Sequence, residues 1–328
     1  MKKISLELGG GGRLMRDFIA DRIIPAFGNS ILDELSDAGL LPGGLALTTD
    51  SYVVDPLFFP GGDIGRLAVN GTVNDLVVSG AEPLYFSLAF ILEEGLDGGV
   101  LDRVIRSIRG AAKAAKVRIV TGDTKVVRRG QGDKIYINTA GIGRSVARPR
   151  AAKIRPGDKI ILTGTLGDHS LAVMLARGEF GLVSNVRSDC APLLFLLPLW
   201  KRGALWMRDI TRGGLATVLF ELAERIPYPI LVEEEKIPLS RPVRAAGDLL
   251  GIDPLYMACE GKAVVIAPAS RAGELLRRIR ANPLGRKAAI IGEVQDRVGR
   301  SGELLLQTAS GGLRLLEPLT SELLPRIC

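Results

Sequence analysis

The thiol of Cys328, the last residue of this 328-residue chain, is the side chain whose position alone suggests chemistry. Its own α-carboxylate lies beside it, and that negative charge raises the thiol pKa because it disfavours the thiolate. A nucleophilic Cys328 therefore needs a base from elsewhere in the fold. Because no residue follows it, the end of the chain can enter a narrow pocket. A terminal cysteine without a function is the alternative.

Three aspartates, Asp50, Asp75 and Asp123, occur on three successive predicted elements of the first half of the chain. Grouped carboxylates repel one another unless a cation gathers them. Oxygen ligands without histidine or cysteine suit Mg²⁺, which often bridges to substrate phosphates. Their spacing leaves two interpretations open: a Mg²⁺ site that binds phosphates, or three unrelated surface or capping acids.

A polar stripe runs along a predicted helix over 64–79. Asn70 and Asn74 are four residues apart and therefore lie on one face, with Asp75 close to it. Gly71 is a poor choice for an exposed helix. This face is therefore expected to press against a ligand or a partner, although a solvent-exposed face is the simpler interpretation.

Three glycine-containing stretches could bind phosphate. The predicted strand over 118–121 ends in Gly122-Asp123-Thr124-Lys125, which places a carboxylate and an amine at the edge of the sheet, where α/β proteins bind ligands. Asp209 precedes two glycines and a predicted helix, an arrangement that suits phosphate or a simple capping turn. Gly9-Gly10-Gly11-Gly12 precedes an amphipathic helix and is either a flexible lid or a plain linker.

The composition excludes several other kinds of site. Three cysteines make no disulfide framework, and His169 is the only histidine, so a zinc site or a Ser-His-Asp triad has little material. His169 is predicted to be a capping or surface residue at a helix start. The net charge of +7 is spread along the chain, which favours a solvated basic surface over nucleic-acid binding. Short apolar runs and the lack of a signal segment predict a cytoplasmic protein that does not enter a membrane.

The length and the hydrophobic periodicity predict two α+β domains, with mixed sheets and helices on one face. A glycine-rich segment and helix over 1–40 precede a first domain over 41–148 with the order β-α-β-α-β-β. The second domain extends over 149–316. A flexible tail over 317–328 carries the terminal cysteine.

Motifs distributed over nearly the whole chain resemble those of the aminoimidazole ribonucleotide synthetase superfamily, and the Pro-Arg-Ile-Cys ending is specific for its hydrogenase-maturation branch. The matching stretches are Asp50-Ser51, Pro60-Gly61-Gly62-Asp63-Ile64-Gly65, Asn70-Gly71-Thr72-Val73-Asn74-Asp75, Gly122-Asp123-Thr124-Lys125, Arg208-Asp209-Ile210-Thr211-Arg212-Gly213-Gly214, Glu260-Gly261-Lys262 and Pro325-Arg326-Ile327-Cys328. The resemblance implies the two-domain fold of this superfamily and a homodimer joined through the sheets of the first domains.

The resemblance also implies ATP and Mg²⁺ as cofactors. The acids that match the metal ligands of the family are Asp50, Asp75 and Asp123. The nucleotide-binding positions that it implies are Asp50, Asn70, Asn74, Asp75, Asp123, Thr124, Lys125 and Asp209.

The reaction implied by the resemblance takes place on Cys328. A carbamoyltransferase partner, HypF, loads a carboxamide onto the thiol, and this chain dehydrates it to a thiocyanate with ATP. The cyanide then passes to iron held by the HypC–HypD pair, for the active site of nickel–iron hydrogenase.

Dehydration needs a phosphoryl acceptor and a base. Attack of the amide oxygen on the γ-phosphate turns a poor leaving group into a good one, after which an N–H proton must be removed. Glu260 is predicted to be this base, or to help deprotonate Cys328, with Lys134 or Lys125 as a nearby cation. The division of roles between the two lysines stays open. Cys259 stands where the family often has an amide residue, and it is predicted to be a small core residue rather than a contact of the tail thiol.

Two other functions remain as alternatives. A sibling of the superfamily, such as a thiamine-phosphate kinase, a selenophosphate synthase or the synthetase itself, shares the acids but has no use for a terminal cysteine. A non-catalytic carrier would only ferry a group on Cys328. ATP turnover separates the two, because a carrier needs none and a kinase would proceed with Cys328→Ala.

Overall fold

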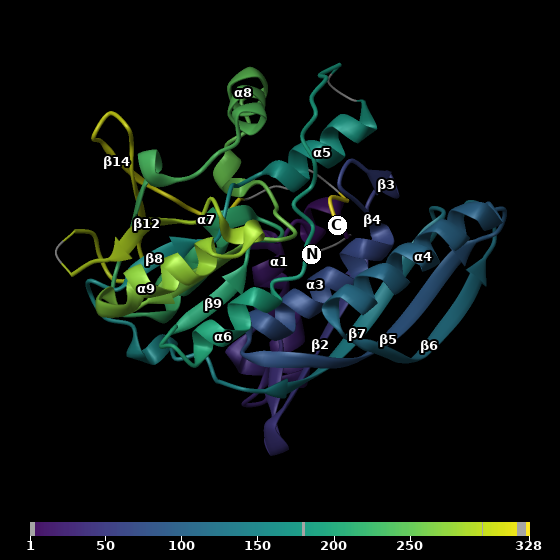
Figure 1. Cartoon of the computed structure of the whole chain (residues 1–328), viewed down its shortest axis with the longest axis horizontal. Helices are drawn as coiled ribbons and strands as arrows, with labels where there is room; N and C mark the ends of the chain where they lie inside the picture. The colour runs from purple at the N-terminus through teal and green to yellow at the C-terminus, as the bar shows by residue number, and fades with distance from the viewer. Residues whose placement is uncertain (1–3, 179–180, 297, 320–325) are drawn as a thin grey trace.

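The computed structural model describes residues 4–178, 181–296, 298–319 and 326–328. Two lobes lie side by side, each built from a β-sheet with packed helices, and α3 (Ile64–Val78) lies between them (Figure 1). The part of the predicted tail over 320–325, which includes Pro325, lies outside the described residues. Among the helices described, none has the length and apolar character needed to cross a bilayer.

The sheet of the first domain has the strand order β1-β2-β7-β5-β6. β5 and β6 are parallel, and the other neighbours are antiparallel. The bounds are Gly39–Leu41 for β1, Leu45–Tyr52 for β2, Ala81–Glu93 for β5, Arg118–Val127 for β6 and Ile135–Ser145 for β7. The predicted order of strands and helices in this domain is confirmed, with β1 as an additional strand.

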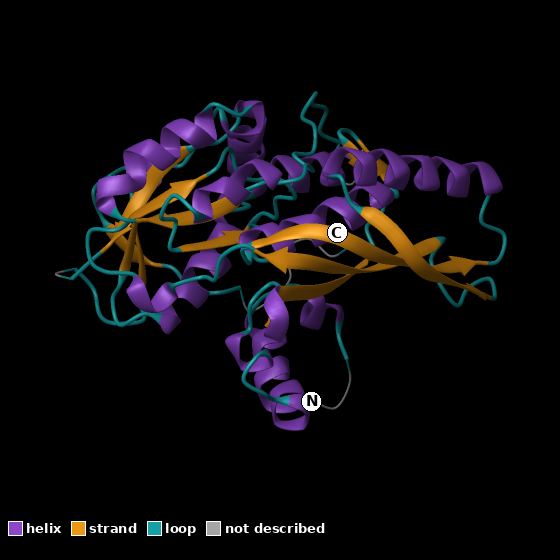
Figure 2. Ribbon diagram, turned by 60° about the horizontal axis from the view of Figure 1, so that its bottom comes forward, coloured by secondary structure: helices purple, strands orange, loops and turns teal. Residues whose placement is uncertain are grey.

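Two helices cover one face of this sheet (Figure 2). They are α3 and α4 (Gly98–Ala115). The predicted N-cap of α3 is confirmed, since Asp63 Oδ1 accepts hydrogen bonds from the backbone N–H groups of Gly65 and Arg66 at 2.9 and 3.0 Å. α3 is buried on nearly all sides because the second domain packs on it as well, which explains a helix whose apolar residues do not keep to one face.

The opposite face of the sheet carries exposed hydrophobic side chains. Side chains alternate along a strand, so Phe86 of β5 is buried against the helices while Tyr85 and Ile91 project from the other face. Ile91 and Ile142 are 45% and 42% exposed. A sheet face with several exposed large hydrophobic residues is typical of an interaction surface.

The second domain contains a seven-stranded sheet in the order β14-β13-β10-β12-β8-β11-β9. Its strands are β8 Lys159–Leu162, β9 Trp206–Asp209, β10 Ile230–Glu233, β11 Ala263–Ala267, β12 Ala289–Val294, β13 Leu304–Gln307 and β14 Leu313–Leu315. Its helices are α5 Asp168–Arg177, α6 Leu197–Trp200, α7 Gly214–Arg225, α8 Arg241–Leu250 and α9 Ala269–Arg280. The smaller elements before these are α1 Arg13–Phe18, α2 Ile24–Phe27, β3 Phe58–Phe59 and β4 Gly62–Asp63.

Two local predictions are wrong. β6 does not end before the Gly122-Asp123-Thr124-Lys125 stretch but continues to Val127, because it pairs with β5 along that whole length. Gly122 permits the close pairing, since a Cβ there would lie 2.2 Å from the carbonyl oxygen of Leu88. β10 and α8 were also missed. β10 is only four residues long, whereas α8 carries ordinary signals of a helix start, namely a serine N-cap at Ser240 followed by a proline in the first turn.

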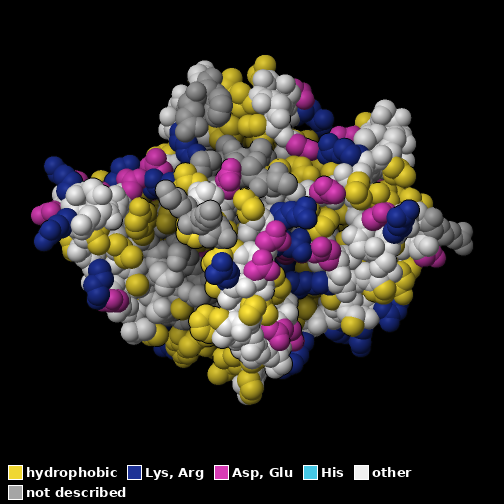
Figure 3. Space-filling model, turned by 180° about the vertical axis from the view of Figure 1, so that it is seen from behind, with side chains coloured by type: hydrophobic (Ala, Val, Ile, Leu, Met, Phe, Trp, Pro, Cys, Tyr) yellow, Lys and Arg dark blue, Asp and Glu magenta, His cyan; other side chains and the backbone are white. Residues whose placement is uncertain are grey.

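Seen from behind, the surface has Lys and Arg side chains close to Asp and Glu side chains near its centre (Figure 3). On this face the charges are mixed rather than gathered by sign. The view agrees with the predicted solvated, mildly basic surface.

Gly71→Ala is expected to destabilise the fold, because a Cβ at this buried position of α3 would lie 2.2 Å from the hydroxyl oxygen of Tyr52. Overpacking of this kind costs about 1–3 kcal/mol of the free energy of unfolding. The matched control is Gly110→Ala in α4, where an added Cβ meets nothing within 4 Å. There alanine should stabilise the helix by about 1 kcal/mol. Urea denaturation measures both changes, and an unaltered stability of Gly71→Ala would contradict the packing of α3 on Tyr52.

Candidate active site

Three carboxylates from separate elements meet between the two domains. Asp37 precedes β1, Asp75 belongs to α3 and Asp209 ends β9, and one oxygen of each lies within 4.8 Å of the others. Asp50 of β2 adjoins them, because its charge acts on both Asp75 and Asp209. The Tyr52 hydroxyl donates a hydrogen bond of 2.9 Å to Asp50. We call Asp37, Asp50, Asp75 and Asp209 the acidic cluster.

The acidic cluster holds more negative charge than the nearby cations offset. Burial raises the pKa of Asp75 and of Asp209 well above the ordinary range, and repulsion among the acids raises both further. Arg208 is the main counter-charge, with Nε 2.9 Å from Asp37 and Nη1 2.8 Å from Glu221. Asp209 Oδ2 is buried and has no hydrogen-bond partner among the described residues. Oxygen ligands with an unpartnered carboxylate oxygen fit a hard cation such as Mg²⁺.

A single chain brings together only part of the predicted metal site. Asp50 and Asp75 lie in the acidic cluster. Asp123 pairs across the sheet with Ala89, whose neighbours along β5 pack against the helices, so both residues project from the uncovered face. There Asp123 Oδ1 lies 2.8 Å from Lys125 Nζ. Asp123 can join the site only if a second chain supplies it.

Two members of the acidic cluster, Asp37 and Asp209, were not predicted to bind a metal, and only the structure places them beside Asp75. Asp37 lies in a segment without a recognisable motif. Asp209, predicted to bind the cofactor, lies at the carboxyl end of β9, shortly before α7 begins at Gly214. The glycines after Asp209 and the resemblance of its stretch to the family motif were the signals in the sequence for this position.

The predicted contact face of α3 packs against the second domain of the same chain, so it is not a solvent-exposed face. Asn74 Nδ2 donates to the carbonyl oxygen of Ala191 at 3.2 Å, and Asn74 Oδ1 accepts from the Leu193 N–H at 2.8 Å. Asn70 Nδ2 donates to Cys190 Sγ at 3.4 Å. The two asparagines therefore fasten a loop of the second domain onto α3. Their predicted role in nucleotide binding remains a prediction.

Glu260 is buried just before β11, behind Cys259, which lies in the core as predicted. Burial raises the pKa of Glu260 well above its ordinary value, and repulsion from Asp209 and Asp189 adds to this, while Arg212 lowers it. Glu260 Oε1 has no hydrogen-bond partner among the residues described. A buried carboxyl with these properties is a candidate acid or base.

The predicted lysines lie elsewhere. Lys134, just before β7, pairs with Asp55 at 3.1 Å and is about half exposed. Lys125 lies on the uncovered face of the sheet with Asp123, and Thr124 lies between them on β6. The cation that acts on the buried glutamate is Arg212. The predicted roles of the two lysines are not tested by this arrangement.

The glycine stretch near the N-terminus lies against Arg212. Arg212 Nη1 donates to the carbonyl oxygen of Gly9 at 3.0 Å. A Cβ at Gly11, whose φ is +73°, would lie 2.7 Å from Arg212 Cβ. The stretch therefore covers this arginine closely, and whether it acts as a lid or as a plain linker stays open.

The end of the chain is docked inside the protein. The Val53 N–H donates to the carbonyl oxygen of Cys328 at 3.1 Å, and Ile327 is only 3% exposed. Arg326 Nε donates to the carbonyl oxygen of Val53 at 2.9 Å, and its guanidinium forms an ion pair with Asp133. The last three residues thus lie along the segment that follows β2.

His169 holds the docked end, so its predicted surface or capping role is wrong. It is fully buried, and its Nε2 lies 2.8 Å from the carbonyl oxygen of Ile327. Nε2 must donate, because a carbonyl only accepts, and Nδ1 accepts from the Ser188 hydroxyl at 2.8 Å. Burial lowers the pKa of His169, which favours this neutral form.

Cys328 is linked electrostatically to the candidate site. Its negative charge is the largest influence that raises the pKa of Arg212, and Asp50 and Glu260 act on the same guanidinium. The terminal residue and two carboxyls, one of them buried, therefore lie close enough to Arg212 to share its charge.

A cavity of about 980 Å³ adjoins the acidic cluster. Asp37, Thr48 and Arg208 line it on one side, and the helical segment around Ile19 and Phe27 lines it on the other. This volume lies within the range of small-molecule and cofactor pockets.

Comparison with known proteins identifies the family. Residues 35–145 match the N-terminal domain of AIR synthase related proteins, and residues 155–304 match the C-terminal domain. The chain is 44% identical to the carbamoyl dehydratase HypE of Rhodobacter capsulatus, with 100% of this chain and 98% of that protein covered.

Solved structures agree. A structure of HypE in complex with ATP is 46% identical with a TM-score of 0.83, covering 99% of this chain and 100% of that one. The HypE–HypF complex contains a chain that is 42% identical with a TM-score of 0.87, covering 92% of this chain and 99% of that one. Because these matches extend over both domains, the chain belongs to the AIR synthase related family and, within it, to the HypE carbamoyl dehydratases.

Proposed function

We propose that this chain uses ATP to dehydrate a carboxamide on Cys328 to a thiocyanate. The observation that carries the proposal is the docked position of Cys328, which shares Arg212 with Asp50 and Glu260. The relatives support it, since they are named carbamoyl dehydratases and one was solved with ATP.

ATP would occupy the cavity of about 980 Å³, with its phosphates toward the acidic cluster. Mg²⁺ held there by Asp37, Asp50, Asp75 and Asp209 would offset the charge on the transferring phosphoryl group. The buried, unpartnered Asp209 Oδ2 and the excess of negative charge support this placement.

The reaction has two steps. The amide oxygen attacks the γ-phosphorus, the bond to ADP breaks and one N–H proton leaves. The product is a thioimidate on Cys328 whose oxygen carries the phosphoryl group. Removal of the second N–H proton then expels phosphate as the carbon–oxygen bond breaks, and a carbon–nitrogen triple bond remains. The chain must therefore supply a base and keep water away from the activated carbon.

Glu260 is the proposed base. Its raised pKa makes its carboxylate a stronger proton acceptor than an ordinary glutamate, and Arg212 lies close enough to stabilise the ionised form. Because only the carboxylate accepts a proton, the rate should fall as the pH falls through this raised pKa. The predicted cation near the base, Lys134 or Lys125, is replaced in this proposal by Arg212.

The test is the intact mass of the protein after loading by HypF with carbamoyl phosphate, before and after Mg-ATP. We expect a carboxamide-sized gain that is absent in Cys328→Ala, followed by an ATP-dependent loss of one water. In Glu260→Gln loading should persist while water loss slows by about 10²–10⁴-fold, the usual contribution of a general base.

Other outcomes point to other functions. Loading without loss of water in the wild type would favour a thiol carrier. Failure of loading with an active transferase would favour a sibling kinase. Native-rate water loss in Glu260→Gln would remove Glu260 as the base.

The docked tail is held by one buried donor that a variant can remove. His169→Phe keeps a buried ring beside Phe59 but loses the hydrogen bond to Ile327. We expect a maleimide to label Cys328 about 5–10 times faster, because one hydrogen bond contributes roughly 1 kcal/mol. His169→Gln, which keeps a donor near the Nε2 position, is the control and should restore much of the protection. Unchanged labelling in His169→Phe would show that His169 does not hold the tail.

We also propose a homodimer through the uncovered face of the first-domain sheet. That face carries exposed Tyr85, Ile91 and Ile142 together with Asp123 and Lys125. Pairing two such faces would bury these hydrophobic residues. It would also offer each Asp123 to the partner's site, which is the remaining way for this predicted ligand to take part.

Ile91→Asp/Ile142→Asp should give monomers by light scattering, because each charge would be buried in the interface without a partner. Ile105→Asp, an equally exposed isoleucine on α4 of the helical face, is the control and should leave the dimer intact. If dimer sites are shared, mixing inactive Asp123→Asn and Glu260→Gln chains should restore activity. A wild type that is monomeric at working concentration would contradict the proposal.

Delivery of the product requires the tail to leave its docked position, since Ile327 is buried and the last three residues are hydrogen-bonded to the segment that follows β2. The proposed recipient is iron held by the HypC–HypD pair, during maturation of nickel–iron hydrogenase in the cytoplasm. HypF must reach the same thiol for loading, and a relative in complex with HypF supports that contact. Both partners would therefore act on an undocked tail.

A further inference from the structure

A second cavity, of about 480 Å³, opens beside the loop that carries Asp189. We call it the basic pocket, because five of its lining residues are cations. They are Arg66, Arg187, Lys262, Arg286 and Lys287. They come from α3, from the loop before Asp189, from the start of β11 and from the segment before β12.

Four of these cations lack a carboxylate partner. Arg66, Arg187, Arg286 and Lys287 form no ion pair with any described residue, although all four line the same cavity. Cations that converge on a cavity repel one another unless an anion enters it. Their convergence from separate elements therefore favours an anionic ligand.

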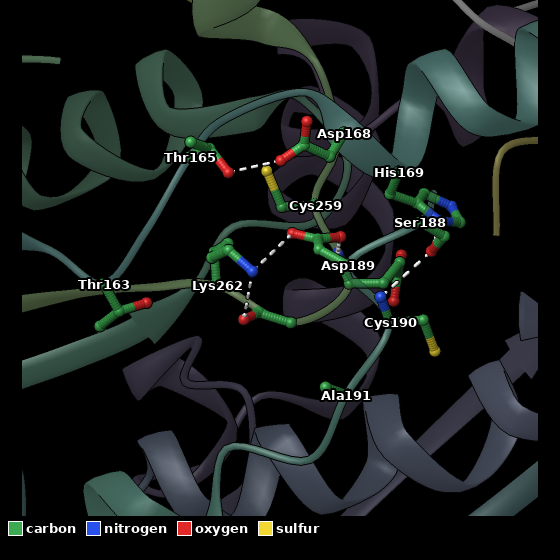
Figure 4. A network of polar contacts seen from close by, with 12 residues as sticks. Thr163, Thr165, Asp168, His169, Ser188, Asp189, Cys190, Ala191, Cys259 and Lys262 are labelled. Carbon is green, nitrogen blue, oxygen red and sulfur yellow. Dashed lines mark hydrogen bonds and ion pairs between the residues drawn. The ribbon is translucent and has the colours of Figure 1, made fainter. Parts of the chain in front are cut away.

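The floor of the basic pocket is a buried ion pair. Lys262 Nζ lies 3.3 Å from Asp189 Oδ2, and the two side chains are 8% and 5% exposed (Figure 4). Lys262 also donates to the carbonyl oxygen of Gly261 at 3.2 Å. Gly164 makes room for the lysine, since a Cβ there would lie 2.6 Å from Lys262 Cε. A built floor distinguishes this cavity from a surface patch of arginines.

Asp189 adds a requirement for a donor. Its Oδ1 accepts from the Glu260 N–H at 2.9 Å, but its buried Oδ2 accepts no hydrogen bond from the described residues. Lys262 offsets the charge of this oxygen without meeting hydrogen-bond geometry, so an anionic ligand that also carries a proton would complete its contacts. A phosphate group does so near neutral pH, because its second pKa is about 6, whereas sulfate has no proton to donate.

The size of the basic pocket decides between free phosphate and a phosphate ester. At about 480 Å³ it falls within the range of pockets for small organic ligands and exceeds the needs of a single oxyanion. Besides its cations it offers Pro283 and Leu284, against which an organic group can lie.

We propose that the basic pocket binds a small phosphate monoester, with its P–OH donated to Asp189 Oδ2 and its charge shared by Lys262, Arg66 and Arg286. The site is separate from the nucleotide cavity, whose lining residues it does not share. It abuts the active site through Asp189, whose other oxygen holds the backbone of Glu260. The proposal does not depend on the dehydratase reaction.

Isothermal titration in the absence of ATP and Mg²⁺ tests the proposal with glycerol 3-phosphate as the probe. Inorganic phosphate and sulfate serve as the comparison anions. The wild type should bind the monoester more tightly than inorganic phosphate. It should bind sulfate at least about tenfold more weakly than either, because sulfate has no proton to donate to Asp189 Oδ2. Saturating Mg-ATP should leave this binding unchanged.

Two variants locate the site. Arg286→Glu should weaken binding of the monoester by about tenfold or more, while substitution of Arg106, an exposed arginine of α4 that forms no ion pair with the described residues, by Glu should not change it. Asp189→Asn should abolish the preference for phosphate over sulfate. Thermal melts check that each variant is folded. Arg286 is exposed, so its substitution should not disturb the fold, and a loss of binding there can be assigned to the lost cation.

Several results would overturn the proposal. They are no binding of glycerol 3-phosphate at millimolar concentration, equal affinities for phosphate and sulfate in the wild type, or displacement by Mg-ATP together with normal binding by Arg286→Glu. Equal affinities for the monoester and inorganic phosphate would overturn the assignment of an ester. None of these results bears on water loss from loaded Cys328, so the two proposals fail independently.

Discussion

Buried negative charge between the domains is the constraint on which this structure depends. Asp75, Asp209 and Glu260 all lose solvent, and burial is the first cause of the raised pKa of each. Among the described residues, Arg208 and Arg212 are the cations that act on them. Burying carboxylates with so few counter-charges is unfavourable. The arrangement is therefore typical of a site whose charge is offset when cations and substrate bind.

α3 makes this arrangement possible because it belongs to both domains. One side packs on the sheet of the first domain, and Asn70 and Asn74 reach the loop of the second. The indole N–H of Trp200 also donates to the carbonyl oxygen of Val77 at 2.9 Å. Asp75 is therefore fixed relative to Asp209 and Glu260, although these residues come from different domains.

The terminal residue reaches the same space by way of backbone contacts. His169, Val53 and Arg326 hold carbonyl or side-chain groups of the last residues, and none of these contacts uses the thiol of Cys328. A few hydrogen bonds of this kind can be broken without unfolding a domain, so the proposed undocking of the tail does not require either domain to unfold.

The sequence by itself determined the local elements, the N-cap at Asp63, the core position of Cys259 and, through a resemblance in motifs, the family. These follow from periodicity, capping and short motifs, which are set within a few residues. Only the tertiary structure brought Asp37 and Asp209 to Asp75, turned Asp123 to the uncovered face and buried His169 against Ile327. The reason is that the parity of a strand position and the packing of two domains decide which distant residues meet, and neither is encoded in local spacing.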